Sequence, residues 1–215
     1  MEHEFWHKKW RQNEIGFHEE QYNPGLVNHL AKLHLAPGSR ILVPLCGKTL
    51  DIRYLMEQGY KVVGAELSEL AVKQLFESLN ITPMVEDRSC GKLYTAQGIQ
   101  VFVGDLFTLQ DHDLSQIDAI YDRAALVALP EDLRAKYTTH LRQITHHAPQ
   151  LLICFDYDQS QMPGPPFSVN AEEVRHHYKA HYKLELVQQS EVKGGLKGRC
   201  PATTNIWALS LNTLV

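Results

Sequence analysis

The chain has 215 residues, a length that suits one domain with a full hydrophobic core and is short for two. Hydrophobic residues make up 44% and charged residues 21% of it, as in ordinary globular proteins, and no window approaches the roughly 18 consecutive apolar residues of a membrane helix. The net charge of −4, without a run of Lys or Arg, argues against a nucleic-acid-binding surface, and the charged N-terminus lacks the apolar region of a signal peptide. We therefore expect a cytoplasmic protein with no nucleic-acid or membrane partner.

The 4 cysteines are scattered along the chain with no Cys-x-x-Cys pair, which favours reduced thiols over a disulfide framework or a zinc site. The 12 histidines include the adjacent pairs His146-His147 and His176-His177, and adjacent side chains point to different sides of a helix. This spacing favours a solvated surface over a metal centre, so we predict that the protein binds no metal.

Residues 1–23 form an N-terminal arm in which aromatic side chains stand in a polar background: Phe5, Trp6, Trp10, Phe17 and Tyr22. If the arm is helical, Trp6 and Trp10 lie on one face. An aromatic face of this kind is buried either on the body of the domain, as a structural cap, or over a ligand, as a lid. The residues alone favour the cap.

Residues 24–35 predict a helix, because apolar side chains recur at helical spacing until Pro37-Gly38 breaks the pattern. The next segment predicts a strand, a helix and a second strand. Residues 40–44 and 61–66 are short apolar runs with β-branched residues, and between them Ile52, Leu55 and Met56 recur at helical spacing before Gly59. The segment is therefore interpreted as one right-handed βαβ unit.

The βαβ unit ends with a carboxylate, Glu66, that follows Gly47 by 19 residues. A carboxylate at the tip of the second strand can accept both hydroxyls of a ribose, which indicates a nucleoside-cofactor site. The intervening turn has neither the G-x-G-x-x-G spacing of a pyrophosphate binder nor the P-loop pattern, so S-adenosylmethionine fits better than NAD or ATP. The alternative is an ordinary βαβ unit with an acid at its end by chance.

After this unit, Ser68 is the expected N-cap of a helix, and residues 82–98 are expected to form a loop or a small hairpin inserted before a third strand at 99–103. Asp105 and Leu106 follow this strand at its carboxyl end, where ligands bind in open α/β sheets. Asp105 and the backbone of Leu106 are therefore candidates to meet an adenine ring. The equal alternative for Asp105 is that it caps a turn.

Residues 117–121 predict a fourth strand, and Arg123 comes just after it. Arg123 is a further candidate site residue. A salt bridge to Asp122 or to another acid explains it equally well from the spacing alone.

The remaining elements complete an α/β fold. They are a helix that begins at Pro130 and Glu131, a fifth strand at 151–157, a short helix at 172–178, and an antiparallel pair at 182–192 and 204–211. This order predicts a single domain over residues 1–215 with the class I S-adenosylmethionine-dependent methyltransferase fold. That fold is Rossmann-like, with a seven-stranded mixed sheet, helices on both faces and an antiparallel last strand.

Motifs along almost the whole chain resemble those of thiopurine S-methyltransferase in its bacterial form. They are WxxxW (Trp6 to Trp10), GFH (Gly16 to His18), VPLCGKTLDI (Val43 to Ile52), GAELSELAV (Gly64 to Val72), DRAALVALP (Asp122 to Pro130) and PGPPFSV (Pro163 to Val169). The most specific part of the resemblance is VPLCGK, DRxALVAxxP and GPPF in that order. Residues 193–200 match least.

The resemblance implies a role for each candidate. The residues that it places at S-adenosylmethionine are Trp10, Leu45, Glu66, Asp105, Leu106 and Arg123, with Glu66 on the ribose, Asp105 and Leu106 at the adenine, and Arg123 beside the reacting end. Phe17 is expected to touch the aromatic substrate, and the arm then becomes a lid rather than a cap.

The expected activity is methyl transfer to the sulfur of aromatic or heterocyclic thiols, and the resemblance extends it to selenium or tellurium species. A thiolate is a strong nucleophile, so no catalytic base is expected, and the partner is a small molecule bound by a monomer. A methyltransferase for an oxygen or halide nucleophile, or a non-catalytic protein that sequesters its ligand, remains an alternative. An NAD-dependent oxidoreductase is disfavoured by the missing glycines.

Overall fold

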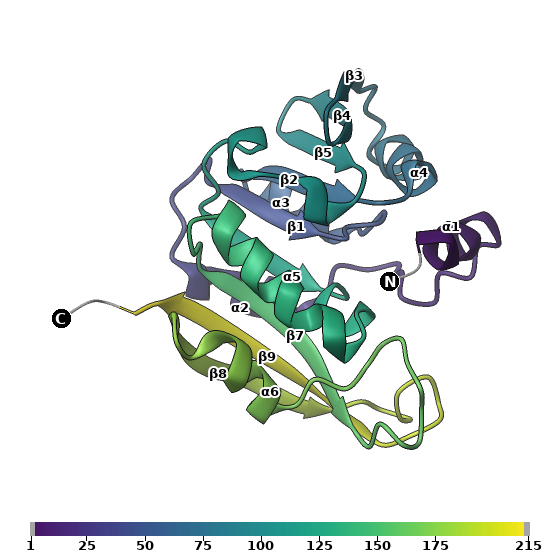
Figure 1. Ribbon diagram of the computed structural model, residues 1–215, viewed down its shortest axis with the longest axis vertical. Coiled ribbons are helices and arrows are strands. Elements are labelled where there is room, and N and C mark those ends of the chain that lie inside the picture. The colour runs from purple at the N-terminus through teal and green to yellow at the C-terminus, as the bar shows by residue number, and fades with distance from the viewer. Residues whose placement is uncertain (1–2, 213–215) are drawn as a thin grey trace.

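The computed structural model describes residues 3–212, in which one mixed β-sheet has helices on both faces (Figure 1). Within these residues the strands are β1 (Arg40–Pro44), β2 (Lys61–Glu66), β3 (Met84–Arg88), β4 (Gly91–Ala96), β5 (Ile99–Val103), β6 (Ala119–Arg123), β7 (Gln150–Tyr157), β8 (Tyr182–Glu191) and β9 (Ala202–Leu211). The α-helices are α1 (His3–Arg11), α2 (Pro24–His29), α3 (Asp51–Glu57), α4 (Glu69–Leu79), α5 (Glu131–Ile144) and α6 (Ala171–Tyr178). Short 3₁₀ helices are η1 (Leu30–Leu33), η2 (Leu106–Thr108), η3 (Asp111–Asp113) and η4 (Leu126–Ala128).

The strand order confirms the predicted fold class and corrects the strand number. Over residues 3–212 the sheet has nine strands in the order β3-β4-β5-β2-β1-β6-β7-β9-β8, not seven. The five strands from β5 to β7 in this order are parallel, and β9 inserts antiparallel between β7 and β8. The two additional strands are the inserted hairpin, because β4 pairs antiparallel with β5 and brings β3 with it.

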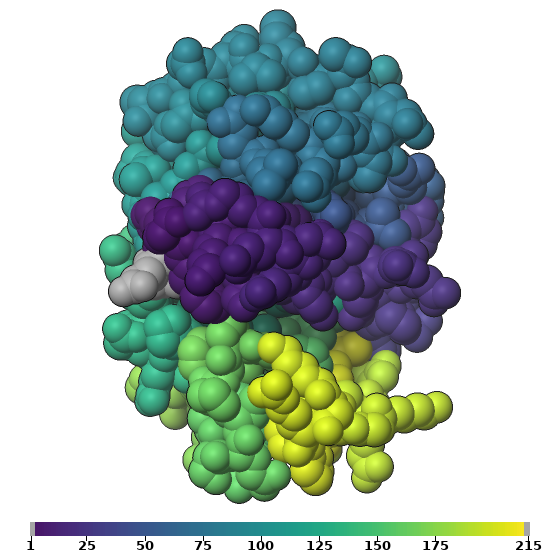
Figure 2. All heavy atoms as spheres, turned by 90° about the vertical axis from the view of Figure 1, so that its right-hand side faces the viewer, coloured from purple at the N-terminus to yellow at the C-terminus, as the bar shows by residue number. Residues whose placement is uncertain are grey.

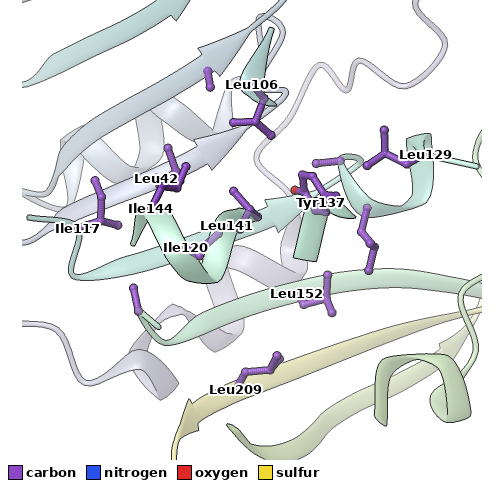
Figure 3. Packing of buried hydrophobic residues seen from close by; sticks show 14 of the residues in the cluster. Leu42, Leu106, Ile117, Ile120, Leu129, Tyr137, Leu141, Ile144, Leu152 and Leu209 are labelled. Atoms are coloured by element: carbon purple, nitrogen blue, oxygen red, sulfur yellow. The ribbon is translucent and has the colours of Figure 1, made fainter. Parts of the chain in front are cut away.

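Two hydrophobic cores cover the two faces of the sheet. On one face α5 and α6 pack against Leu42, Ile120 and Leu152, which come from three neighbouring strands; Figure 3 shows these side chains opposite Leu141 and Ile144 of α5. On the other face α2, η1, α3 and α4 pack against the alternate strand positions, such as Ile41 and Val43 of β1. Each such side chain contributes roughly 1.5 to 3 kcal/mol of burial free energy, which holds the parallel strands in one register.

Most helix predictions are confirmed, and one helix is shorter than predicted. Ser68 caps α4 by accepting a hydrogen bond from the Ala71 N–H at 3.4 Å. The segment predicted as one helix over 24–35 is α2 followed by the 3₁₀ helix η1, and it ends where His34 adopts a left-handed conformation with φ 50°. The helices at 131–144 and 171–178 lie where the apolar spacing predicts them.

The fourth strand of the predicted series, β6, lies two residues further along the chain than predicted. Residues 117 and 118 precede the ladder, where the Asp118 side chain accepts a hydrogen bond from the Arg40 N–H. The strand then continues through the polar residues Asp122 and Arg123, which pair with Leu152 and Ile153 of β7. Arg123 is therefore the last residue of a strand and not part of the following loop.

Three further observations concern residues 3–212. No helix there has the length and apolar character needed to cross a membrane. The four cysteines are free thiols, and three of them, Cys46, Cys154 and Cys200, are buried. No cluster of three or more His, Cys, Asp or Glu side chains in this range has an arrangement that could hold a metal ion.

Candidate active site

The predicted site residues gather at the edge of the sheet where the parallel strands end. Leu45, Glu66, Asp105 and Arg123 stand at or just after the carboxyl ends of β1, β2, β5 and β6. The arm lies across this edge: Figure 2 shows it in purple between the blue and teal residues above and the green and yellow residues below. The carboxyl edge of an open α/β sheet is where such folds bind their ligands.

Glu66 joins two turns of this edge. The carboxylate is only 6% exposed; its Oε2 accepts a hydrogen bond from the Gly47 N–H at 2.8 Å, and its Oε1 accepts one from the Ser68 N–H at 2.8 Å. Burial raises the pKa of Glu66 above its ordinary value, and the backbone N–H groups of Ser68, Gly47 and Leu67 oppose that shift. A carboxylate has about four acceptor positions, which is the type of group that a ribose diol needs.

The turn after β1 brings the backbone close to the arm. Leu45 and Gly47 both have positive φ angles, 47° and 51°, and a Cβ atom on Gly47 would lie 2.9 Å from the Trp10 ring. Gly47 is therefore required twice, by its backbone conformation and by the ring that covers it. Trp10 is 4% exposed, so its indole is buried against this turn.

The aromatic residues of the arm form one cluster beside the turn. The Phe17 ring lies edge-on to two indoles, with its centroid 5.6 Å from that of Trp10 and 5.9 Å from that of Trp6. Such edge-to-face pairs contribute about 0.5 to 1.5 kcal/mol beyond burial. The structure thus brings Trp10 and Phe17 together.

Arg123 is paired with the arm. Its Nη2 lies 2.5 Å from Oε1 of Glu19, with the arginine side chain 13% exposed and the glutamate side chain 47% exposed. The salt-bridge interpretation of Arg123 is therefore confirmed, with Glu19 rather than Asp122 as the partner. Glu19 is not among the predicted site residues, because it lies 104 positions before Arg123 and no local pattern signals this contact.

Asp105 and Leu106 are close in sequence but differ in their surroundings. The Asp105 carboxylate accepts a hydrogen bond from the Phe107 N–H at 3.0 Å and caps η2, as the turn-capping interpretation predicts; its other oxygen lies 3.4 Å from His3 Nε2. Leu106 is 3% exposed, its side chain belongs to the core under α5, and its carbonyl oxygen is 2.9 Å from His140 Nε2.

A cavity of about 490 Å³ opens between α1, the start of α4 and the end of β5; Glu66 is not one of its lining residues, but Leu67 and Ser68, which follow it, are. Its walls include His7 and Arg11 of α1, Leu67 and Ser68 after β2, and Val103 and Gly104 at the end of β5. His7 and Arg11 are absent from the sequence predictions, although their spacing of four places both on one face of a helix. The size suits a nucleoside-sized group, and the position links the Glu66 and Asp105 turns.

The loop between β8 and β9, where the resemblance is weakest, also reaches this side of the molecule. Lys197 Nζ donates a hydrogen bond to the Pro165 carbonyl at 2.7 Å and ties the loop to the proline-rich segment after β7. Burial and the nearby Arg199 and Lys9 lower the pKa of Lys197.

Asp122, the residue before Arg123, is hydrogen-bonded inside the core. Its carboxylate is fully buried, and it accepts hydrogen bonds from the Tyr137 hydroxyl at 2.8 Å and from the Leu126 N–H at 3.1 Å. These contacts hold the turn after β6, in which Ala124 has a φ of 61°. Burial raises the pKa of Asp122 to about 6 despite the hydrogen bonds.

The strand order and the carboxylate at the end of β2 define a class I S-adenosylmethionine-dependent methyltransferase fold, and solved structures share it. One is Burkholderia thailandensis 1,6-didemethyltoxoflavin-N1-methyltransferase with bound S-adenosylhomocysteine: TM-score 0.65, 14% identity, 98% of this chain and 87% of that chain. Another is a TehB-like S-adenosylmethionine-dependent methyltransferase from Corynebacterium glutamicum: TM-score 0.57, 16% identity, 97% of this chain and 98% of that one.

Sequence comparison then identifies the family. The family described as thiopurine S-methyltransferase matches residues 1–202. Thiopurine S-methyltransferase from Teredinibacter turnerae is 50% identical over 99% of both chains, and that from Xanthobacter autotrophicus is 49% identical over 97% of this chain and 99% of its own. The chain belongs to the thiopurine S-methyltransferase family; it is a methyltransferase, and its cofactor is S-adenosylmethionine.

The buried carboxyl group of Asp122 predicts a pH dependence of stability. Between its ordinary pKa of 3.8 and the folded-state value of about 6, the unfolded chain releases the proton while the folded chain keeps it. The contribution of Asp122 to stability is therefore fully present below about pH 4 and is lost as pH rises to about 6, by roughly 2 to 3 kcal/mol. Asp122→Asn removes this loss and flattens the profile.

Urea unfolding of wild type and Asp122→Asn at several values between pH 4 and pH 7 measures the effect. Asp132→Asn is the control, because it removes the same charge from an exposed position of α5. Parallel profiles for wild type and Asp122→Asn would contradict the prediction.

Proposed function

We propose that the enzyme transfers a methyl group from S-adenosylmethionine to the sulfur of small aromatic or heterocyclic thiols such as thiopurines. The observation that carries the proposal is a largely buried cation held by the aromatic arm: Arg123 forms an ion pair with Glu19 of the arm. Glu19 follows Phe17 by two positions, and the Phe17 ring packs on Trp10. A cation suits an anionic acceptor and aromatic side chains suit an aromatic one, and the family membership of the chain supports the same acceptor.

The donor site in this proposal is the set given by the resemblance: Trp10, Leu45, Glu66, Asp105, Leu106 and Arg123. The residues present fit the group. Glu66 presents a carboxylate, whose oxygens can each accept more than one hydrogen bond, at the end of β2. The cavity of about 490 Å³ is lined by Leu67 and Ser68 after β2 and by Val103 and Gly104 before Asp105. The arm, residues 1–23, acts as a lid whose Trp10 closes the turn at Gly47.

When bound, S-adenosylmethionine supplies an electrophilic methyl group on a sulfonium. The chain's own contribution is to align the acceptor, exclude water and stabilise its negative charge. A guanidinium is a cation and a poor proton acceptor, so the role of Arg123 is to stabilise the thiolate, and the thiol proton leaves to solvent. Because the acceptor would react as its thiolate, with the methyl group moving from the sulfonium to the acceptor sulfur, the chain would need no catalytic base.

The proposal includes acceptors and properties that follow from the same chemistry. Selenolates and tellurolates are soft anions like thiolates, so selenium and tellurium species belong to the acceptor range. One sheet spans the described residues, which supports a single domain. The proposal takes this domain to work as a monomer on a small molecule. Four free thiols support a reducing, cytoplasmic setting.

An acceptor competition tests the reaction type. With S-adenosylmethionine as donor, an aromatic thiol offered together with a catechol and a halide is expected to yield the S-methylated product with many turnovers per enzyme. Mass spectrometry of the products measures the outcome. A dominant O-methyl or halide product favours the oxygen or halide alternative, and stoichiometric binding without product favours ligand sequestration.

The donor role of Glu66 is tested with a ligand pair. Wild type is expected to bind S-adenosylhomocysteine more tightly than its 2′-deoxy analogue, by about 1 to 3 kcal/mol, because the missing hydroxyl leaves the carboxylate unpaired. Glu66→Gln is expected to bind both ligands weakly and almost equally. Calorimetric titration measures both affinities, and Glu185→Gln, on the exposed face of β8, is the control. Full discrimination retained by Glu66→Gln removes Glu66 from the ribose.

Arg123→Ala tests stabilisation of the acceptor anion. Turnover is expected to fall by about 10- to 100-fold for weakly acidic thiols and less for thiols that are already ionised, because the arginine matters most where ionisation is incomplete. Arg123→Lys keeps the charge and is expected to lose less. Steady-state rates across a thiol series measure the trend. Equal losses across the series count against this role.

A further inference from the structure

The ion pair between Arg123 and Glu19 sets a condition on any acceptor that uses this cation. Arg123 is 13% exposed, and Glu19 is its ion-pair partner among residues 3–212. The neighbouring acid, Asp122, is directed instead to the Tyr137 hydroxyl and the Leu126 N–H inside the core. An anion that approaches Arg123 therefore finds the Glu19 carboxylate already paired with it.

Glu19 is held in this position by more than the arginine. Its second oxygen, Oε2, accepts a hydrogen bond from Asn23 Nδ2 at 3.3 Å. Asn23 is itself the N-cap of α2, and its N–H donates to the buried Asp51 at 2.8 Å. The carboxylate is thus presented to Arg123 from a segment anchored to the body of the domain, and the pair is a built feature of the fold.

The exposures of the two side chains show which member of the pair can leave. Glu19 is 47% exposed and can exchange its arginine contact for water at little cost, whereas Arg123 is largely buried. Ion pairs with a solvent-exposed member change a binding constant by about fivefold or less. An anionic acceptor carries the same negative charge as the Glu19 carboxylate, so it can replace Glu19 as the partner of Arg123.

We infer that Glu19 is an internal counter-ion that competes with the acceptor anion for Arg123, and that it thereby sets how strongly the enzyme prefers charged over neutral aromatic acceptors. The inference rests on the proposed function, because it places the acceptor anion at Arg123. It adds a specificity-determining residue on the arm that neither the motifs nor the strand ends predict. Removing the charge of Glu19 leaves Arg123 available to the acceptor alone.

Glu19→Gln tests the inference, with Glu20→Gln as the matched control. Glu20 is the next residue, is exposed, and forms no ion pair among the described residues, so its variant removes the same charge from the arm. The probes are 4-nitrothiophenol as an ionised acceptor, benzoate as an unreactive anion, and benzamide as its neutral counterpart.

In Glu19→Gln the KM for 4-nitrothiophenol and the inhibition constant of benzoate are expected to fall by about two- to fivefold, the range that such a pair supports. The inhibition constant of benzamide and the kcat are expected to stay within about twofold of wild type. In Glu20→Gln all four values are expected to match wild type within the same range.

Several results would overturn the inference: an unchanged or raised KM and benzoate constant in Glu19→Gln, an equal fall for benzamide, an equal effect of Glu20→Gln, or no benzoate binding to either protein. Failure of the proposed function has a different signature, since no S-methylated product then forms from wild type or any variant. In that case calorimetric titration of benzoate into wild type and Glu19→Gln still decides whether Glu19 competes for Arg123.

Discussion

The buried carboxylate of Glu66 is the contact on which the site depends. It accepts one hydrogen bond from an N–H group in the turn after β1 and one from an N–H group in the turn after β2. The same carboxylate therefore holds both turns in place. Burial opposes its ionisation, and these two N–H groups favour it. Because Trp10 packs directly on Gly47, the position of the arm follows from the same contact.

Local sequence patterns predict the centre of this fold well and its edges less well. The bounds of β1, β2 and β5 match the prediction because each strand is an apolar run between polar or glycine-containing turns. β6 is displaced because its last two residues, Asp122 and Arg123, are polar, yet they still pair with β7. The hairpin at 84–96 is one of the two predicted alternatives for residues 82–98, a loop being the other. Its addition to the sheet depends on pairing with β5, which no local pattern encodes.

The candidate site likewise contains residues that the sequence predicts and residues that only the tertiary structure shows. Strand ends and motif resemblance point to Glu66, Asp105 and Arg123, because each of them follows a recognisable strand in the sequence. Glu19 and the walls contributed by His7 and Arg11 arise from the arm folding over a distant edge. Such contacts join residues separated by many tens of positions, and they become visible only when the tertiary structure is known.

The arm is tied to the sheet edge by two contacts of different strength. At Gly47 the tie is apolar and buried, since Trp10 is 4% exposed, and salt and small charged ligands do not weaken it. At Arg123 the tie is an ion pair with a half-exposed carboxylate, which water, salt or another anion can replace. The proposed donor therefore lies under the apolar Trp10–Gly47 contact, while the proposed acceptor lies at the Arg123–Glu19 ion pair, which can be exchanged. A single arm can in this way keep the cofactor covered and still admit a succession of small anions at its far end.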